Sequence, residues 1–428
     1  MQCFMSLKSR GFKMNISYIL IVDGASTSAS YAPLFRAYGI PCIHLFSDPV
    51  IASHFGAMIN QQDYVACLTH QGDITQTLER LSKWQISAVL HGLDSALAVA
   101  GAIANALNLT YVNEPELNLA RRHKFEMIET VRKAGLRAPE QILSDNIQVI
   151  LNWVGNRNQY PVIIKPVESA GVKGVFKCSS IKEVHRYFNK VMNSSSYYEE
   201  PNTTVLIQSF LAGKEYILDS VSLNGKHYLT SIWLVKRDNG SSPFLDNMET
   251  VDHTLPKYTV IREYATAVLN ALGVRNGPSH LEVILTENGP ALVELNCRLH
   301  GSLDLRLTTY ACGRNHVQDV VTSLLSPDYF MTSCSHPLSF YGQAMHVLLR
   351  SPLAGRKLRK DYWSRLETLS SFVSYKSNLP TEGITPKTKD LKTAIGTLSL
   401  FNRDSKQLAT DLLLVRHEEN TGAMYKQD

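Results

Sequence analysis

The sequence lacks several features that mark particular classes of protein. Its 428 residues contain no run of five or six like charges, and a formal net charge of +5 is small for this length. This argues against the clustered basic stripe that is typical of nucleic-acid-binding proteins. No window approaches the roughly 20 apolar residues that a membrane-spanning helix needs. The chain also has no internal repeat and no low-complexity tract. We therefore expect neither nucleic acid nor a membrane among its partners.

Cysteine is scarce and scattered. The seven residues are odd in number and no two have CxxC spacing, which argues against both a structural zinc site and a disulfide framework. This pattern predicts a reducing, cytoplasmic location. The cysteines are Cys3, Cys42, Cys67, Cys178, Cys297, Cys312 and Cys334.

The N-terminus has a superficial likeness to a signal peptide. Three basic residues, Lys8, Arg10 and Lys13, precede the apolar stretch "ISYILIV". That stretch is short, ends at Asp23 and is not followed by a small-residue cleavage site. We expect residues 1–13 to be an extension and the apolar stretch to be the first strand of a domain.

Strands alternate with helices in the first quarter of the chain. This alternation predicts an α/β, Rossmann-like domain over residues 14–112 with an open, mostly parallel sheet. No GxGxxG follows the first strand, so a dinucleotide site is not expected. Residues 23–28 and 91–95 follow strands at the edge where such sheets bind ligands, although plain connections are the more ordinary interpretation. The predicted strands are 18–22, 40–46, 64–69 and 86–92.

The pattern changes after residue 112. A helical segment ends at Gly135, and strands separated by glycine and asparagine turns then dominate from residue 161 to 296, which predicts mainly antiparallel sheets. The tail from residue 337 mixes short strands with a final helix. With 44% apolar and 19% charged residues, the composition is that of an ordinary globular protein, and the length suits two to three domains.

One predicted strand carries a lysine and runs directly into a loop of small residues. In "VIIKPVESAGVKGV", residues 162–175, Lys165 precedes Ser169, Ala170, Gly171 and Gly174. Backbone N–H groups in such a loop can approach phosphate oxygens closely. An ordinary strand followed by a glycine turn explains the same residues equally well, so this stretch alone leaves both interpretations open.

A hairpin is predicted around Asn288 and Gly289, because Asn-Gly between two apolar strands is a strong turn signal. A two-residue turn would place Glu282 and Glu294 on opposite faces of the hairpin. A three-residue turn that includes Glu287, with the glycine in the left-handed conformation, would set the two glutamates directly opposite each other. We predict the three-residue turn.

Two glutamates that lie so close would repel each other unless a cation lay between them. Asn296 shares a face with Glu294, so the hairpin offers an oxygen-only set of ligands suited to Mg²⁺. Arg298 continues the same face and could bind a phosphate or an oxyanion. Cys297 turns to the opposite face and is expected in the core. The ordinary alternative is a hairpin whose charged residues face solvent.

Five segments in a fixed order change the balance between these alternatives. The chain resembles the ATP-grasp superfamily, and within it the carboxylate-amine ligases that join amino acids, namely the L-amino acid ligases and dapdiamide-synthetase-like enzymes. The likeness covers nearly the whole chain from Met14. The segments are "RRHKFEM", "PVIIKPVESAGVKGV", "VLIQSFLAGKEYILD", "GPSHLEVILTENGPALVELNCRLHG" and, more faintly, "TKDLKTAIGTLSL".

The resemblance implies an α/β (α+β) grasp fold, in which a Rossmann-like parallel sheet precedes domains with mainly antiparallel sheets. The implied divisions are a pre-ATP-grasp domain at 14–112, linker helices with a lid subdomain at 113–212, a catalytic core at 213–336 and a C-terminal subdomain at 337–428.

The resemblance also assigns expected roles at the nucleotide. Two lysines would reach the phosphates, a small-residue loop would cover them, two backbone groups would bind adenine and an acid would accept hydrogen bonds from the ribose. Many relatives carry a glutamate where this chain has Gln208 or Ser209, so that side-chain contact stays open. The residues concerned are Lys124, Lys165, Ser169, Ala170, Gly171, Val172, Gly174, Gln208, Phe210, Leu211 and Glu215.

The remaining expected roles concern the metal, the chemistry and the substrates. By the same resemblance, Glu282, Glu294 and Asn296 would hold Mg²⁺, with Mn²⁺ as an alternative. Arg298 would act in catalysis together with Lys165 by stabilising the charge on the acyl phosphate and the tetrahedral intermediate. Candidates for the substrate pocket are Glu249, His280, His300 and Ser302.

The implied function is an ATP-dependent ligase that forms an amide, in particular a dipeptide, between L-amino acids. A substrate carboxylate would attack ATP to give an acyl phosphate and ADP, and an amine would then displace phosphate. Two alternatives stay open: an ATP-grasp ligase with a non-amino-acid carboxylate or amine, and a non-catalytic ATP-binding scaffold. The sequence does not identify the two substrates, and a homodimer is an expectation from the family alone.

Overall fold

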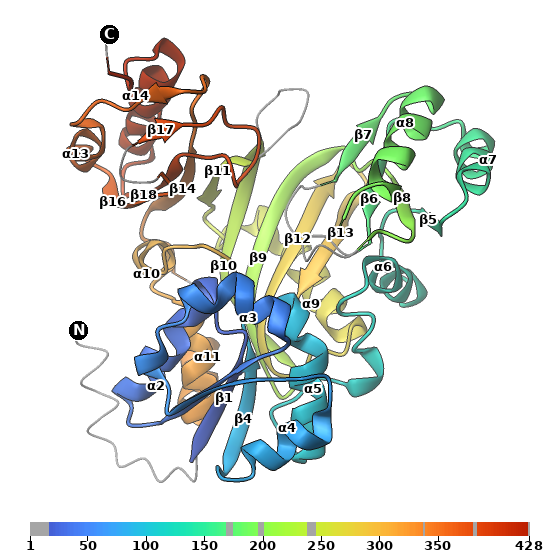
Figure 1. Cartoon of the computed structure of the whole chain (residues 1–428). Helices are drawn as coiled ribbons and strands as arrows, with labels where there is room; N and C mark the ends of the chain where they lie inside the picture. The colour runs from blue at the N-terminus through green and yellow to red at the C-terminus, as the bar shows by residue number, and fades with distance from the viewer. Residues whose placement is uncertain are drawn as a thin grey trace.

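The computed structural model describes residues 17–167, 174–195, 201–237, 245–336, 339–379 and 383–426. Figure 1 shows an N-terminal α/β domain in blue at the base, a small sheet with its helices in green on one side, and the C-terminal elements in orange and red on the other. Long strands of a larger sheet run between these parts. None of the described helices is long and apolar enough to cross a membrane.

The N-terminal domain contains a four-stranded parallel sheet in the order β3-β2-β1-β4, which confirms the predicted parallel arrangement. Residues 19–22 are fully buried, because helices cover both faces of the sheet: α2 and α11 on one face and α5 on the other. Burial on both faces explains why this strand is uniformly apolar. The elements are β1 (Tyr18–Val22), β2 (Cys42–Phe46), β3 (Ala66–Thr69), β4 (Ile86–His91), α2 (Tyr31–Ala37), α3 (Pro49–Phe55), α4 (Ile74–Leu81), α5 (Leu97–Ala106) and α11 (His316–Leu325).

A small antiparallel sheet follows, in the order β5-β8-β6-β7. Its outer face packs beneath α7 and α8. Successive strand residues point to opposite faces, so the inner face is left for residues such as Lys165. The elements are α6 (Lys124–Lys133), β5 (Gln141–Ser144), α7 (Ile147–Arg157), β6 (Val162–Pro166), β7 (Phe176–Cys178), α8 (Ile181–Met192) and β8 (Val205–Ser209).

The largest element is an eight-stranded antiparallel sheet in the order β13-β12-β9-β10-β11-β14-β18-β16. Helix α9 and the apolar side of α6 bury one face of its first strands, and α10 packs on the opposite face. This arrangement confirms the predicted antiparallel architecture. The elements are β9 (Gly213–Leu223), β10 (Lys226–Arg237), β11 (Leu245–Thr250), α9 (Thr259–Ala271), β12 (Gly277–Thr286), β13 (Gly289–Asn296), α10 (Arg306–Cys312) and α12 (Pro327–Ser335).

The C-terminal segment completes this sheet rather than forming a separate one. Strands β14, β18 and β16 extend it from β11, and the terminal helix α14 packs on their apolar side chains. Residue 337, the predicted start of a C-terminal subdomain, therefore separates segments that share one sheet. The elements are β14 (Gln343–Leu349), β15 (Arg356–Lys357), α13 (Tyr362–Glu367), β16 (Phe372–Ser377), β17 (Ile384–Thr385), β18 (Gly396–Asn402) and α14 (Ser405–Thr421).

The β12–β13 hairpin has the predicted pairing of acids but a different turn. Glu282 lies directly opposite Glu294, as predicted. Thr286 pairs with Gly289, so the turn has two residues, and the predicted three-residue turn is wrong. A register shift beside Glu282 leaves Val293 as the extra residue of a bulge. This extra residue brings Glu294, and not Val293, opposite Glu282.

Candidate active site

Lys165 lies on the inner face of the small sheet. Its neighbour Ile164 is fully buried in the core beneath α8, and alternation along β6 turns Lys165 to the other side. Lys165 pairs with Leu206 in β8 and is only 6% exposed. The strand thus holds the lysine stem in the protein and directs its amine toward the larger sheet.

The predicted lysines and acids converge on one centre. Lys124 is the first residue of α6, and its Nζ lies 2.8 Å from Oε1 of Glu294. Burial and, to a smaller extent, the charge of Lys124 lower the pKa of Lys165 to about 8, although Glu294 and Glu282 oppose the shift. Charges shift one another's pKa only at close range. Two amines from the side of the small sheet therefore face two acids of the larger sheet.

Glu282 stays ionised although it is partly buried. Burial would raise its pKa, but His280, Arg237 and Lys124 lower it to about 2. Nε2 of His280 lies 3.7 Å from Oε1 of Glu282. Arg237 was not among the predicted site residues, and it also donates from Nε to Oε2 of Glu215 over 2.7 Å. Strand alternation along β10, which places Arg237 on the face of Trp233, was the available signal.

The donor set fits a hard divalent cation. Glu282 and Glu294 offer carboxylate oxygens from directly paired positions, and Asn296 lies two residues beyond Glu294 on the same face. Oxygen-only sets with carboxylates suit Mg²⁺. The two carboxylates would repel each other without positive charge between them, and in this structure Lys124 and Arg237 supply part of it.

The residues with expected adenine and ribose contacts lie in, or directly after, an inner strand of each sheet. Gln208 shares the inner face with Lys165, is 5% exposed and donates to Oε1 of Gln141 over 2.9 Å. Phe210 and Leu211 follow the end of β8. Glu215 lies in β9, where its carboxylate is already bonded to an arginine. These roles stay predictions.

Part of the expected phosphate-covering loop is not described. Ser169, Ala170, Gly171 and Val172 lie outside the described residues. Gly174 is described and has a φ of +77°, which L side chains rarely adopt. A Cβ at this position would meet Cγ of Pro166 at 2.9 Å. The end of the loop therefore requires glycine both for its backbone conformation and for its close approach to β6.

Comparison with known proteins agrees with this geometry. The family model of the ATP-grasp domain matches residues 158–304, a range that contains Lys165 and the acidic hairpin. Dapdiamide A synthase from Enterobacter agglomerans is 29% identical over 349 residues, which cover 80% of this chain and 82% of the relative. Residues 158–304 therefore form an ATP-grasp domain, and four fifths of the chain is similar in sequence to dapdiamide A synthase.

Solved structures with little sequence similarity share the ATP-grasp fold. The L-amino acid ligase from Bacillus licheniformis superimposes with a TM-score of 0.75 at 16% identity and covers 95% of this chain and 98% of its own. N5-carboxyaminoimidazole synthetase from Staphylococcus aureus, in complex with ADP, has a TM-score of 0.68 at 13% identity and covers 95% of this chain and 98% of its own. These likenesses concern the fold.

The N-terminal domain contributes to the ATP-grasp site through loops at the carboxyl end of its sheet. Asp94, which follows β4, accepts a hydrogen bond from Nε of Arg298 over 2.9 Å. Ser26, which follows β1, accepts one from the backbone N–H of Ser302 over 2.9 Å. The segments after these strands are therefore more than plain connections. Asp94 could have been found from the sequence only by knowing which loops meet Arg298.

One predicted substrate residue does not join the site. Glu249 pairs with Leu234, which pairs with Tyr216, whereas Glu282 pairs with Ile217. Directly paired residues share a face and successive residues alternate. Glu249 therefore lies on the opposite face from Glu282, where it forms an ion pair with a lysine of β10. The sequence alone did not show which face of the sheet the residues of this polar segment take.

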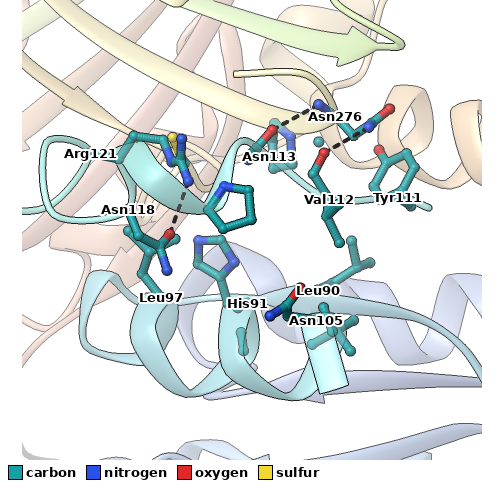
Figure 2. A pocket seen from close by; sticks show the side chains of 18 residues that line it. Leu90, His91, Leu97, Asn105, Tyr111, Val112, Asn113, Asn118, Arg121 and Asn276 are labelled. Carbon is teal, nitrogen blue, oxygen red and sulfur yellow. Dashed lines mark hydrogen bonds between the residues drawn. The ribbon is translucent and has the colours of Figure 1, made fainter. Parts of the chain in front are cut away.

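A separate cavity of about 80 Å³ lies behind the site, between the N-terminal domain and the start of β12 (Figure 2). Arg121 donates to Oδ1 of Asn118 beside it, over 3.0 Å. Cys297 also lines it, on the side away from Asn296, and burial raises the pKa of its thiol to about 12. A thiol with so high a pKa is a poor nucleophile, in keeping with the core position expected for this residue.

The low pKa of Lys165 predicts weaker nucleotide binding at alkaline pH. We expect the affinity for Mg-ADP to fall as the pH rises through about 8, because Lys165 loses its charge there. Calorimetric titration between pH 7 and 9 measures this, with Lys190→Arg as a control on α8. Lys165→Arg should bind with little pH dependence, because an arginine stays charged. An unchanged slope in that variant would contradict the assignment.

The lowered pKa of Lys165 affects stability in the opposite direction to binding: stability rises with pH where binding weakens. The unfolded chain, in which Lys165 has its ordinary pKa of 10.5, binds more protons than the folded chain between about pH 8 and 10.5. The contribution of Lys165 to the free energy of unfolding therefore increases with pH across that window.

Proposed function

We propose that this protein is an ATP-dependent ligase that joins two L-amino acids through an acyl phosphate, with ADP and phosphate as products. The observation that carries the proposal is the convergence of Lys124 and Lys165 with Glu282 and Glu294. The two lysine amines have the charge needed to bind the phosphates of ATP. The two carboxylates and the amide oxygen of Asn296 are ligands that Mg²⁺ prefers. The similarity to dapdiamide A synthase, and a fold shared with an L-amino acid ligase, support a ligase that acts on amino acids.

The residues of this chain would act mainly by positioning and by charge. Lys124 and Lys165 would bind phosphate oxygens and offset the repulsion between a substrate carboxylate and the triphosphate. Mg²⁺, when held by Glu282, Glu294 and Asn296, would neutralise the charge of the transferring phosphoryl group. Arg298, oriented by its bond to Asp94, would stabilise the oxyanion formed at the substrate carbonyl.

A single assay tests the proposal against its two alternatives. The protein is incubated with Mg-ATP and pools of amino acids, and the release of ADP and phosphate is measured together with new amide products by mass spectrometry. We expect release that requires two amino acids. Release with one carboxylate and a non-amino-acid amine would support the other ligase, and nucleotide binding without turnover in any pool would support a scaffold.

A further inference from the structure

A buried carboxylate on the floor of the site organises two histidines. Asp219 in β9 is fully buried and accepts hydrogen bonds from Nδ1 of His280 and from Nδ1 of His300, each over 3.0 Å. Ser231 and Trp233 also donate to it, over 3.0 and 3.1 Å. Burial would raise the pKa of Asp219, but the two histidines hold it well below its usual range. The carboxylate therefore fixes both imidazole rings.

The two histidines differ in what their second ring nitrogen faces. Nε2 of His280 faces Glu282, 3.7 Å away. Within the described part of the chain, some buried ring nitrogens have no hydrogen-bond partner, and Nε2 of His300 is not among them. The His300 side chain is 8% exposed. By contrast, His316 and His346 each bury an Nδ1 without a partner. Of the two histidines bonded to Asp219, His280 is therefore the one whose outer nitrogen faces Glu282, and His300 is the slightly more exposed one.

His300 lies beside the groups assigned to the chemistry. Its ring centroid is 4.3 Å from that of His280, which contacts Glu282. Arg298, two residues earlier, is close enough to lower its pKa. An imidazole in this place would lie near an acyl phosphate bound between Arg298 and the acids of the hairpin.

We propose that His300 is the base that takes a proton from the incoming amine, with Asp219 as the residue that positions it. The inference rests on the proposed function. In the second step the amine nitrogen bonds to the acyl carbon while the bond from that carbon to the phosphate oxygen breaks. An ammonium substrate loses two protons on becoming an amide: Nε2 of His300 accepts one, and the departing phosphate carries away the other. The pairing of a buried carboxylate with Nδ1–H leaves Nε2 as the acceptor.

The groups around His300 keep it neutral near pH 7. Burial lowers its pKa below the ordinary value of 6.5; Asp219 on β9 opposes this, while His280 on β12 and Arg298 on its own segment lower it. Two further histidines act on it, His316 on α11 and His346 on β14. Burial lowers the pKa of each of these two to about 4, so they add no charge at neutral pH.

The test separates the two half-reactions in His300→Gln. Hydroxylamine, which is uncharged at neutral pH, traps an acyl phosphate as a hydroxamate without a base. We expect hydroxamate formation to be retained and amide formation at pH 7 to fall about 100-fold. The remaining rate should rise with pH toward the pKa of the amine substrate, because a larger share of the amine is then uncharged. His227→Gln, at the far end of β10 and bonded to Ser222 and Asn270, should change neither rate.

Each other outcome counts against a stated claim. Equal losses in both assays would make His300 structural, and no loss in either would place the proton acceptor elsewhere; either result overturns the inference. Wild-type protein that forms no hydroxamate with any carboxylate overturns the proposed function itself. His300→Asn, a smaller amide, repeats the comparison if thermal unfolding shows that His300→Gln is misfolded.

Discussion

Replacing Glu294 by glutamine is expected to reduce ADP release about 1,000-fold, the largest loss for a single conservative change in this chain. Glutamine keeps the shape of the side chain but removes its charge. The change deletes the 2.8 Å ion pair with Lys124 and one of the two carboxylates available to Mg²⁺. The measurement is steady-state ADP release at saturating Mg-ATP with the amino acid pair found by the pool assay.

The hairpin itself offers the control. Glu287 is an exposed residue in the two-residue turn of the same hairpin, so Glu287→Gln removes an equal charge without touching the centre. Its rate should match the wild type, and both variants should have similar thermal unfolding midpoints. If Glu294→Gln turned over at a normal rate with a normal requirement for Mg²⁺, the acids of this hairpin would not be the metal site.

Replacing Arg298 by alanine is expected to lower kcat about 100- to 1,000-fold, the usual cost of removing one oxyanion donor. Two of its donors are already engaged: Nε with Asp94 over 2.9 Å and Nη1 with the carbonyl of Leu299 over 3.0 Å. These two bonds hold the guanidinium in place. Because its proposed partner is the charge that develops during the reaction, KM for ATP should change little.

Arg137 provides a matched arginine for this experiment. It donates to the carbonyl of Gly289 over 3.0 Å at the turn end of the same hairpin, so Arg137→Ala tests loss of a hairpin contact remote from the acids. We expect near-normal kcat. A rise in KM for ATP with unchanged kcat in Arg298→Ala would show instead that Arg298 binds the nucleotide in its ground state.

The sequence predicted the elements of the fold because their signals are local. The apolar run at residues 18–22 and the helices around it were sufficient for a parallel sheet, and alternation along β6 and β13 identified which residues could share a face. The pairing of Glu282 with Glu294 was correct although the predicted turn was wrong. Val293 has the same apolar character as Ala291, Leu292 and Leu295 of its strand, so nothing in its side chain marked it as the extra residue of a bulge.

The missed and misplaced residues depend on contacts between distant segments. Asp94 reaches Arg298 across 204 positions of the chain, and Asp219 joins histidines 61 and 81 positions away. Glu249 was misplaced because the facing of β11 is set by its pairing with β10. Such pairings follow from how whole sheets and helices pack, and packing is not recorded in the spacing of a single segment.

The sequence by itself determined which segments become strands. It also showed that one strand carries Lys165 and that the β12–β13 hairpin carries mainly oxygen ligands. Chain folding decided the rest: that these parts meet, that two loops of the first sheet bond to Arg298 and Ser302, and that one buried carboxylate aligns a pair of imidazoles. Backbone periodicity is a property of neighbours, whereas mutual distance is a property of packing, since only the packed core brings remote side chains within a few ångströms.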